Sequence, residues 1–153
     1  MGYTHYWELN PNGKKKDLSG CLGKIKEVIL QHADIIQYEE DKAKLPLVSN
    51  KLIMFNGIGN DGHETFYFEY PPKKKVSYSV DDDGFIFAFC KTARKPYDIV
   101  VCKCLLILKE YLREDMKLSS DGDWNCEDEW KPAIEQVTKM GIDIVPCLVV
   151  DEI

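Results

Sequence analysis

The sequence has no long uninterrupted hydrophobic run. Its longest apolar stretch, residues 99–108, is broken by Lys103 and falls short of the ~20 apolar residues that a membrane-spanning helix needs. The first residues also lack the charged and apolar regions of a secretory signal. We therefore expect a cytoplasmic protein without a membrane partner.

Cysteine pairs with the spacing of a zinc knuckle are missing, because no two cysteines are separated by two residues. The thiols are spread through apolar segments, which is typical of reduced cysteines in the core of a cytosolic protein. The six cysteines are Cys21, Cys90, Cys102, Cys104, Cys126 and Cys147. We expect them to be reduced, and we expect neither a structural metal nor a cofactor.

Motifs of established catalytic centres are absent as well, since the sequence contains no HExxH, HxH, Walker or GxSxG pattern. His63 and Glu64 have side chains suited to acid–base chemistry, but neighbouring residues of a strand point to opposite faces. We therefore assign no catalytic residue from the sequence.

Size and charge narrow the class of protein. A chain of 153 residues with 44% hydrophobic content can bury roughly 70% of its unfolded surface, so we predict one domain over residues 1–153. The 20 basic and 26 acidic side chains give a net charge of −6, which argues against nonspecific binding of nucleic acid. A local basic pocket is compatible with this charge. The composition leaves the oligomeric state open, a homo-oligomer included.

Hydrophobic patterns predict five or six strands and about three helices in uneven order, hence an α+β domain with a mainly antiparallel sheet. The predicted strands cover residues 3–9, 51–55, 64–70, 85–91 and 116–120, with 142–150 as a sixth edge strand or a docked tail. The predicted helices cover about residues 19–38, 96–112 and 127–140.

Three of these elements have predicted positions. Strand 3–9 carries large rings on both faces, so we expect it inside the sheet. Strand 85–91 has almost no polar side chain before its end, which predicts a central strand buried on both faces. Helix 96–112 is apolar nearly all round and should be the central, most buried helix.

A basic segment lies where the fourth predicted strand ends and the second predicted helix begins. It contains Lys91, Arg94 and Lys95, with no acid before Asp98. The free N–H groups and the positive dipole end of a helix N-terminus attract phosphates and carboxylates. We predict an anion site here, although these cations could equally pair with acids on a solvated surface.

Polar groups next to this segment and at the end of the fifth predicted strand extend the predicted site. Thr92 could donate a hydroxyl, and Tyr97 could stack on a base. Ser119, Ser120 and Asp121 could meet a ligand hydroxyl or phosphate. A turn with local side-chain hydrogen bonds is the alternative for this second cluster.

Aromatic side chains of the first strand complete the predicted site. Tyr3, His5 and Trp7 share one face of that strand and could line a pocket for a planar base. His5 could equally be a hydrogen-bonded histidine of the core. Asn56, in the glycine-rich loop after the second strand, is a candidate reader of a base or ribose.

Five blocks of the sequence carry a family resemblance. They are MGYTHYW at 1–7, FNG at 55–57, HETF at 63–66, FCKTARKPYD at 89–98 and SSDGDW at 119–124. Together they resemble a family of small, largely uncharacterised phage and prophage proteins, and the likeness spans most of the chain. The resemblance implies a phage-encoded protein in the cytosol of a bacterial host, where counter-defence is a plausible role.

We therefore expect a protein that captures a small phosphorylated, nucleotide-derived molecule, a class that includes bacterial immune signals. In this hypothesis cations neutralise phosphates, hydroxyls bind phosphate or ribose, and rings enclose a base. The predicted ligand-binding residues are Tyr3, His5, Trp7, Asn56, Lys91, Thr92, Arg94, Lys95, Tyr97, Ser119, Ser120 and Asp121.

Two other functions are open from the sequence. An enzyme could cleave the same class of molecule, with His5, His63 or Glu64 as acid or base. Alternatively, a protein inhibitor could cover a basic host factor with acids such as those at residues 81–83.

Overall fold

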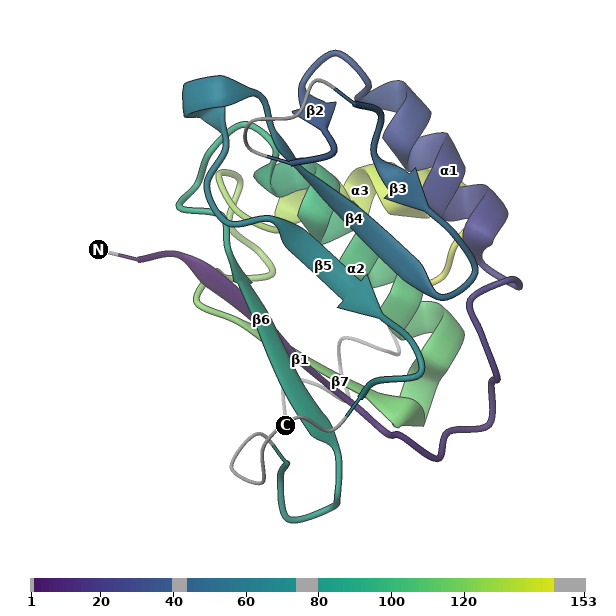
Figure 1. Cartoon of the computed structure of the whole chain (residues 1–153). Coiled ribbons are helices and arrows are strands. Elements are labelled where there is room, and N and C mark those ends of the chain that lie inside the picture. The colour runs from purple at the N-terminus through teal and green to yellow at the C-terminus, as the bar shows by residue number, and fades with distance from the viewer. Residues whose placement is uncertain (1, 40–43, 74–79, 145–153) are drawn as a thin grey trace.

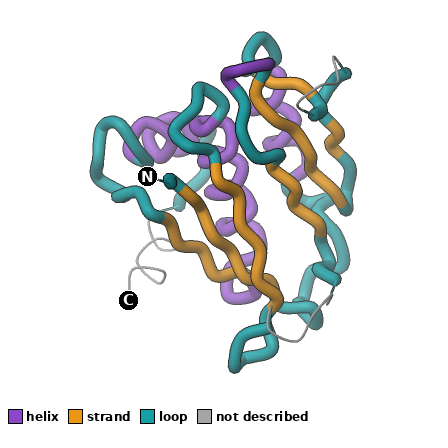
Figure 2. Tube along the Cα trace, turned by 60° about the vertical axis from the view of Figure 1, so that its left-hand side comes forward, coloured by secondary structure: helices purple, strands orange, loops and turns teal. Residues whose placement is uncertain are grey.

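The computed structural model describes residues 2–39, 44–73 and 80–144. The predicted α+β class is confirmed: three α-helices accompany two antiparallel sheets, with seven strands in the described residues. The helices lie on one side of both sheets, as the two views in Figures 1 and 2 show. This arrangement leaves the opposite faces of the sheets without a helical cover.

The smaller sheet joins three segments that are far apart in the sequence. Its strands are β1 (Thr4–Leu9), β6 (Ile86–Lys91) and β7 (Met116–Ser120), in the order β6-β1-β7. The prediction that the N-terminal strand lies inside the sheet is confirmed. In the antiparallel register, His5 lies beside Cys90 on one side and Ser120 on the other.

The prediction that strand 85–91 is central and buried on both faces is wrong. β6 ends the strand order of its sheet, and its residues alternate between buried and exposed. Phe87 is 39% exposed and Phe89 is 53% exposed. A run of apolar residues is consistent with burial on both faces, but it does not itself establish what covers the second face.

The larger sheet is built around β4 (Leu52–Gly57). β2 (Ile36–Gln37), β3 (Leu47–Val48) and β5 (Phe66–Glu69) each pair antiparallel with β4. β4 and β5, which match the predicted strands 51–55 and 64–70, form a hairpin with the 3₁₀ turn η1 (Gly59–Asp61) in its loop.

The helices are shorter than the sequence pattern predicts. They are α1 (Leu22–Gln31), α2 (Asp98–Leu112) and α3 (Lys131–Lys139), with the 3₁₀ turn η3 (Arg113–Asp115) after α2. The predicted extension of the first helix to residue 38 is wrong, because Ile36 and Gln37 pair with β4 instead. The last helix ends just before Gly141, whose φ of 88° glycine adopts without strain.

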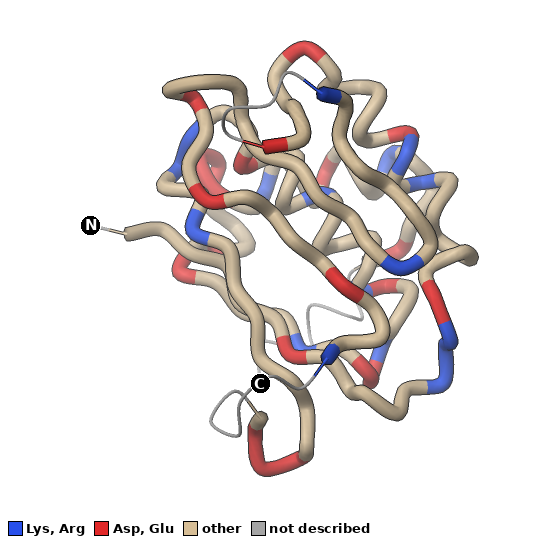
Figure 3. The backbone as a smooth tube through the Cα atoms, viewed as in Figure 1, with Lys and Arg blue, Asp and Glu red and all other residues tan. Residues whose placement is uncertain are grey.

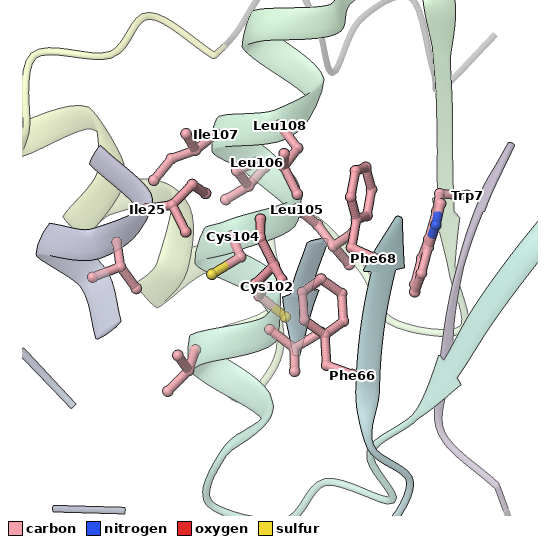
Figure 4. Packing of buried hydrophobic residues seen from close by; sticks show 14 of the residues in the cluster. Trp7, Ile25, Phe66, Phe68, Cys102, Cys104, Leu105, Leu106, Ile107 and Leu108 are labelled. Atoms are coloured by element: carbon pink, nitrogen blue, oxygen red, sulfur yellow. The ribbon is translucent and has the colours of Figure 1, made fainter. Parts of the chain in front are cut away.

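The core lies between α2 and the two sheets, and α2 is the most buried helix, as predicted. Trp7 of β1 bridges the sheets, because its ring lies 5.5 Å from that of Phe66 and 5.7 Å from that of Phe68. Figure 4 shows these rings facing the side chains of α2. One continuous core therefore joins β1, the β4–β5 hairpin and α2.

Two sequence predictions concern segments that the structure describes only in part. The sixth strand, at 142–150, and Cys147 lie largely or wholly outside the described residues. The five described cysteines are free thiols, in line with the prediction for them. None of the helices in the described residues combines the length and apolar character needed to cross a bilayer.

Lys103 is an unexpected member of the core, since it is only 2% exposed. Its Nζ donates a hydrogen bond of 2.9 Å to Nε2 of His32, and no carboxylate of the described residues forms an ion pair with it. Burial lowers the pKa of Lys103 below its usual value. The ammonium ion of Lys103 is therefore less favourable in the folded protein than in water.

We expect Lys103→Met to raise the free energy of unfolding at neutral pH by about 1 kcal/mol, because it removes a buried charge at similar volume. Because the pKa of Lys103 is lower in the folded protein than in the unfolded chain, the buried charge destabilises the wild type at low pH. This destabilisation disappears as the pH rises towards 10.5, the ordinary pKa of lysine. Urea unfolding should therefore show a smaller difference in the free energy of unfolding between Lys103→Met and the wild type at alkaline pH than at neutral pH. Lys26→Met, at an exposed position of α1, is the control. A variant less stable than the wild type at neutral pH would contradict this account.

Candidate functional site

The histidine of β1 is held between a carboxylate and a hydroxyl. Nδ1 of His5 lies 2.7 Å from Oγ of Ser120, and Nε2 lies 2.7 Å from Oδ1 of Asp98. The His5 side chain is fully buried, whereas that of Asp98 is 14% exposed. We call this chain of hydrogen bonds the Asp98–His5–Ser120 relay. It joins the central strand, the edge strand β7 and the start of α2.

The partners of Ser120 determine where the protons of the relay lie. The backbone N–H of Gly122 and the indole N–H of Trp130 each donate to Ser120 Oγ at 2.9 Å. These donors occupy both lone pairs, so the hydroxyl proton must point to Nδ1 of His5. In the neutral imidazole the remaining proton then sits on Nε2 and is donated to Asp98.

Asp98 provides the negative charge at the N-terminus of α2. Its Oδ1 also accepts a 2.5 Å hydrogen bond from the Thr92 hydroxyl, and the thiol of Cys102 lies 3.7 Å from Oδ2. Burial, reinforced by the Asp98 charge, raises the pKa of Cys102 and keeps its thiol protonated. The chain itself therefore supplies an anion where the helix dipole favours one.

The turn between β6 and α2 has a strained backbone. Ala93 and Arg94 both have positive φ angles, 54° and 61°, which residues with side chains rarely adopt. The Arg94 guanidinium lies 4.0 Å above the ring of Tyr3 and pairs with Glu129 at 2.7 Å. The buried hydroxyl of Tyr3 has no hydrogen-bond partner in the described residues. Any side chain at Gly122 would come within 2.1 Å of that hydroxyl.

Three of the predicted ligand-binding residues have their side chains engaged inside the fold. Trp7 is buried between the sheets, and the hydroxyl of buried Tyr97 donates to the carbonyl of Glu64 at 2.5 Å. The amide of Asn56 makes hydrogen bonds to the hairpin loop on both its oxygen and its nitrogen, including two with the backbone of His63. These contacts organise the loop and the turn beside it.

The remaining predicted residues lie at or near the surface. Lys95 is half-buried in the turn after β6, and Lys91 and Ser119 lie on the outward side of the smaller sheet. The exposed carboxylate of Asp121 accepts the hydroxyl of Tyr6 at 3.0 Å. Neither Lys91 nor Lys95 forms an ion pair with a described residue. The structure thus brings one predicted group together around His5 and another on the outward side.

Donor atoms of His5, Asp98 and Cys102 lie within 4.8 Å of one another, which is close enough to surround a metal ion. A histidine that binds a metal usually donates its other ring N–H to an acceptor. Here Ser120 donates to Nδ1, and Nε2 carries the proton shared with Asp98. This hydrogen-bond pattern favours a proton relay over metal ligation.

The outward side of the smaller sheet carries an array of rings and polar groups, which we call the aromatic face. Its cross-strand rows are Lys91 beside Thr4, Phe89 beside Tyr6 and Ser119, and Phe87 beside Glu8 and Lys117. The Phe87 ring is stacked with Tyr6 at 6.0 Å and lies 5.9 Å from Phe89. Exposed, contiguous rings are uncommon on soluble proteins unless they bind something.

A hollow of about 500 Å³ adjoins the aromatic face. It is lined from that face by Tyr6, Glu8, Phe87, Lys117 and Ser119, and by neighbouring groups of β7 and α2. This volume lies within the range of sites for small molecules. The hollow and the exposed rings therefore form a continuous candidate surface for a ligand.

The two ends of the aromatic face differ in charge. At one end, Lys117 donates to Asp81 and Asp83 at 2.8 and 2.7 Å, and burial together with Asp81 raises the pKa of Glu8. At the other end, the Lys91 ammonium forms no ion pair with a carboxylate of the described residues, while the Lys91 backbone N–H donates to Oε1 of Glu64 at 2.7 Å. Figure 3 shows the acids gathered at the turn before β6. A phosphate would be repelled at the acidic end and attracted at the Lys91 end.

Sequence reasoning overlooked several of these groups. The alternation of Phe87, Phe89 and Lys91 along one strand could have indicated a shared outward face. The four-residue spacing of Asp98 and Cys102 places them on one side of a helix. No local sequence pattern predicts that these two residues contact His5, because the contact depends on how β1 and α2 pack together.

The chain matches no known protein-family profile, no curated protein and no solved structure. The candidate sites are therefore defined by the geometry and chemistry of its own residues.

We expect Asp98→Asn to lower the free energy of unfolding by about 2 kcal/mol, because hydrogen bonds to a charged acceptor are replaced by neutral ones. Urea unfolding followed by circular dichroism measures the change. Asp82→Asn is the matched control, because Asp82 is exposed and has no described side-chain hydrogen bond. Equal stability of the two variants would show that the relay contributes nothing to the fold.

Proposed function

We propose that the protein binds a small phosphorylated, nucleotide-derived molecule on the aromatic face without altering it. The observation that carries this proposal is the exposed pair of rings, Phe87 and Phe89, the first of which lines a hollow of suitable size. Rings held in place by a sheet offer a flat surface on which a base can stack.

The base is assigned to the rings and the acidic end of the aromatic face. Tyr6 and Phe87 are already stacked on one another, so the rings offer a continuous platform at low entropic cost. Glu8, at the edge of the hollow, can accept a hydrogen bond from an amino group of a base when it is ionised. Negative charge at this end disfavours the phosphate there.

The ribose and phosphate are assigned to the opposite end. Ser119 and Asp121 border the rings and can bind ribose hydroxyls. Lys91 lies two residues from Phe89, about 7 Å along the strand, and supplies a charge for the phosphate. Lys95 adds a second cation in the adjacent turn. Arg94 is already engaged by a ring and a carboxylate, so we expect a smaller contribution from it.

The biological setting follows from the family resemblance. A phage-encoded protein in a bacterial cytosol would find nucleotide-derived immune signals among its potential ligands. Binding alone would suffice to withdraw such a signal. A capture protein should return its ligand intact after denaturation, whereas an enzyme should return products, and mass spectrometry distinguishes the two results.

We expect Phe89→Ser and Lys91→Gln each to weaken binding of ADP-ribose by about tenfold, because one removes a stacking ring and the other a charged contact. Isothermal titration calorimetry measures the affinity. Tyr67→Ser and Lys26→Gln remove an exposed ring and an exposed lysine elsewhere on the surface, and they should bind as the wild type does.

The proposal extends to a panel of AMP, ADP-ribose and cyclic dinucleotides. No binding to any member of this panel would contradict it. Equal losses in the four variants would also contradict it, because the effect would then not belong to the aromatic face.

A further inference from the structure

We propose that Ser120 is a nucleophile activated by His5 and Asp98, and that it accepts an acyl group from a neutral carboxylic ester. The order of groups is that of a catalytic triad: a hydroxyl donates to one nitrogen of an imidazole, and the other nitrogen donates to a carboxylate. Such triads are recognised by geometry and proton positions, not by sequence order.

This activity would use the opposite side of the sheet from the aromatic face. Ser119 and Ser120 are neighbours in β7, so their side chains point to opposite faces. Ser119 is exposed beside Tyr6, whereas Ser120 contacts His5 on the inward side. The inference is therefore independent of nucleotide binding.

The relay places each proton where nucleophilic attack needs it. Because two N–H donors occupy the lone pairs of Ser120 Oγ, its proton already lies towards His5 Nδ1. Asp98 accepts the Nε2 proton and would stabilise the imidazolium ion that forms when Nδ1 takes up the serine proton. Asp98 is thus a positioning residue in this reaction, and His5 is the general base.

One of these two N–H donors can serve the developing oxyanion. Attack requires one lone pair of Oγ to be released, and the indole of Trp130 is the side-chain donor that can be displaced. Once released from Oγ, the indole N–H of Trp130 would lie beside the carbon under attack, whereas the backbone N–H of Gly122 would stay on Oγ. Donors in that position stabilise the negative charge of a tetrahedral intermediate.

Charge near Ser120 favours a neutral substrate. On the inward side, the carboxylate of Asp98 contacts His5, and the carboxylate of Glu129 is paired with Arg94, which lies over the ring of Tyr3. On this inward side, away from Lys91, the two acids would repel a phosphate ester, whereas an ester of a carboxylic acid carries no charge at its reacting carbon. The site therefore suits acyl transfer better than phosphoryl transfer.

The chemical step is conventional. Ser120 Oγ forms a bond to the carbonyl carbon while its proton passes to His5 Nδ1. The bond from that carbon to the leaving alkoxide oxygen then breaks, and His5 returns the proton to this oxygen. Water hydrolyses the resulting serine ester by the same route, with His5 again accepting and returning one proton.

A fluorophosphonate probe tests the inference on the full chain, since attack by serine forms an O–P bond and expels fluoride. Intact-mass measurement and peptide mapping should find one probe group, on Ser120, in the folded wild type and none in urea. Ser19→Ala removes an exposed serine hydroxyl outside both sites and should be labelled at the wild-type rate. His5→Gln should be labelled at least about a hundredfold more slowly, the lower end of general-base effects.

The outcomes that overturn the inference are equally definite. A folded wild type without label on Ser120 contradicts it, as does labelling of Ser120 no faster than that of Ser119. Both results come from the wild-type protein, so they do not depend on whether His5→Gln folds.

Discussion

The hydrogen bond between the Asp98 carboxylate and the buried imidazole of His5 is the contact on which the arrangement of this protein depends. It ties the central strand of the smaller sheet to the first turn of the most buried helix. Thr92 and Cys102 add donors to the same carboxylate, and Ser120 extends the chain of hydrogen bonds to the edge strand. A buried polar group must find such partners, so β1, β7 and α2 have little freedom to shift.

Successive side chains of β1 and β7 point to opposite faces of the smaller sheet, so the two candidate sites lie on opposite sides of that sheet. Inward side chains form the relay, and outward ones form a face of rings bordered by a lysine. The inward groups are preorganised by hydrogen bonds, whereas the outward rings are open to a ligand. Helices cover only the inward side, which accounts for the exposure of Phe87 and Phe89.

Local signals were sufficient to predict most elements but not how their faces are covered. The ring-rich start of the chain predicted an internal strand, and the apolar sequence after Pro96 predicted the central helix, because both patterns reflect burial directly. Phe87 and Phe89 had the same apolar character as core residues, and only the strand order shows that one of their sides is uncovered. Likewise, the sequence identified His5 and Ser120 as candidates but could not identify Asp98 as their partner, since residues 93 positions apart meet only through tertiary packing.

The position of the protons on His5 tests the account most directly. ¹⁵N NMR of the imidazole at neutral pH distinguishes a protonated nitrogen from one that accepts a hydrogen bond. The account predicts a proton on Nε2 and an unprotonated Nδ1 that accepts from Ser120. A neutral His5 with its proton on Nδ1 would contradict it. Ser120 Oγ would then face three N–H donors, and its own hydroxyl proton would have no acceptor.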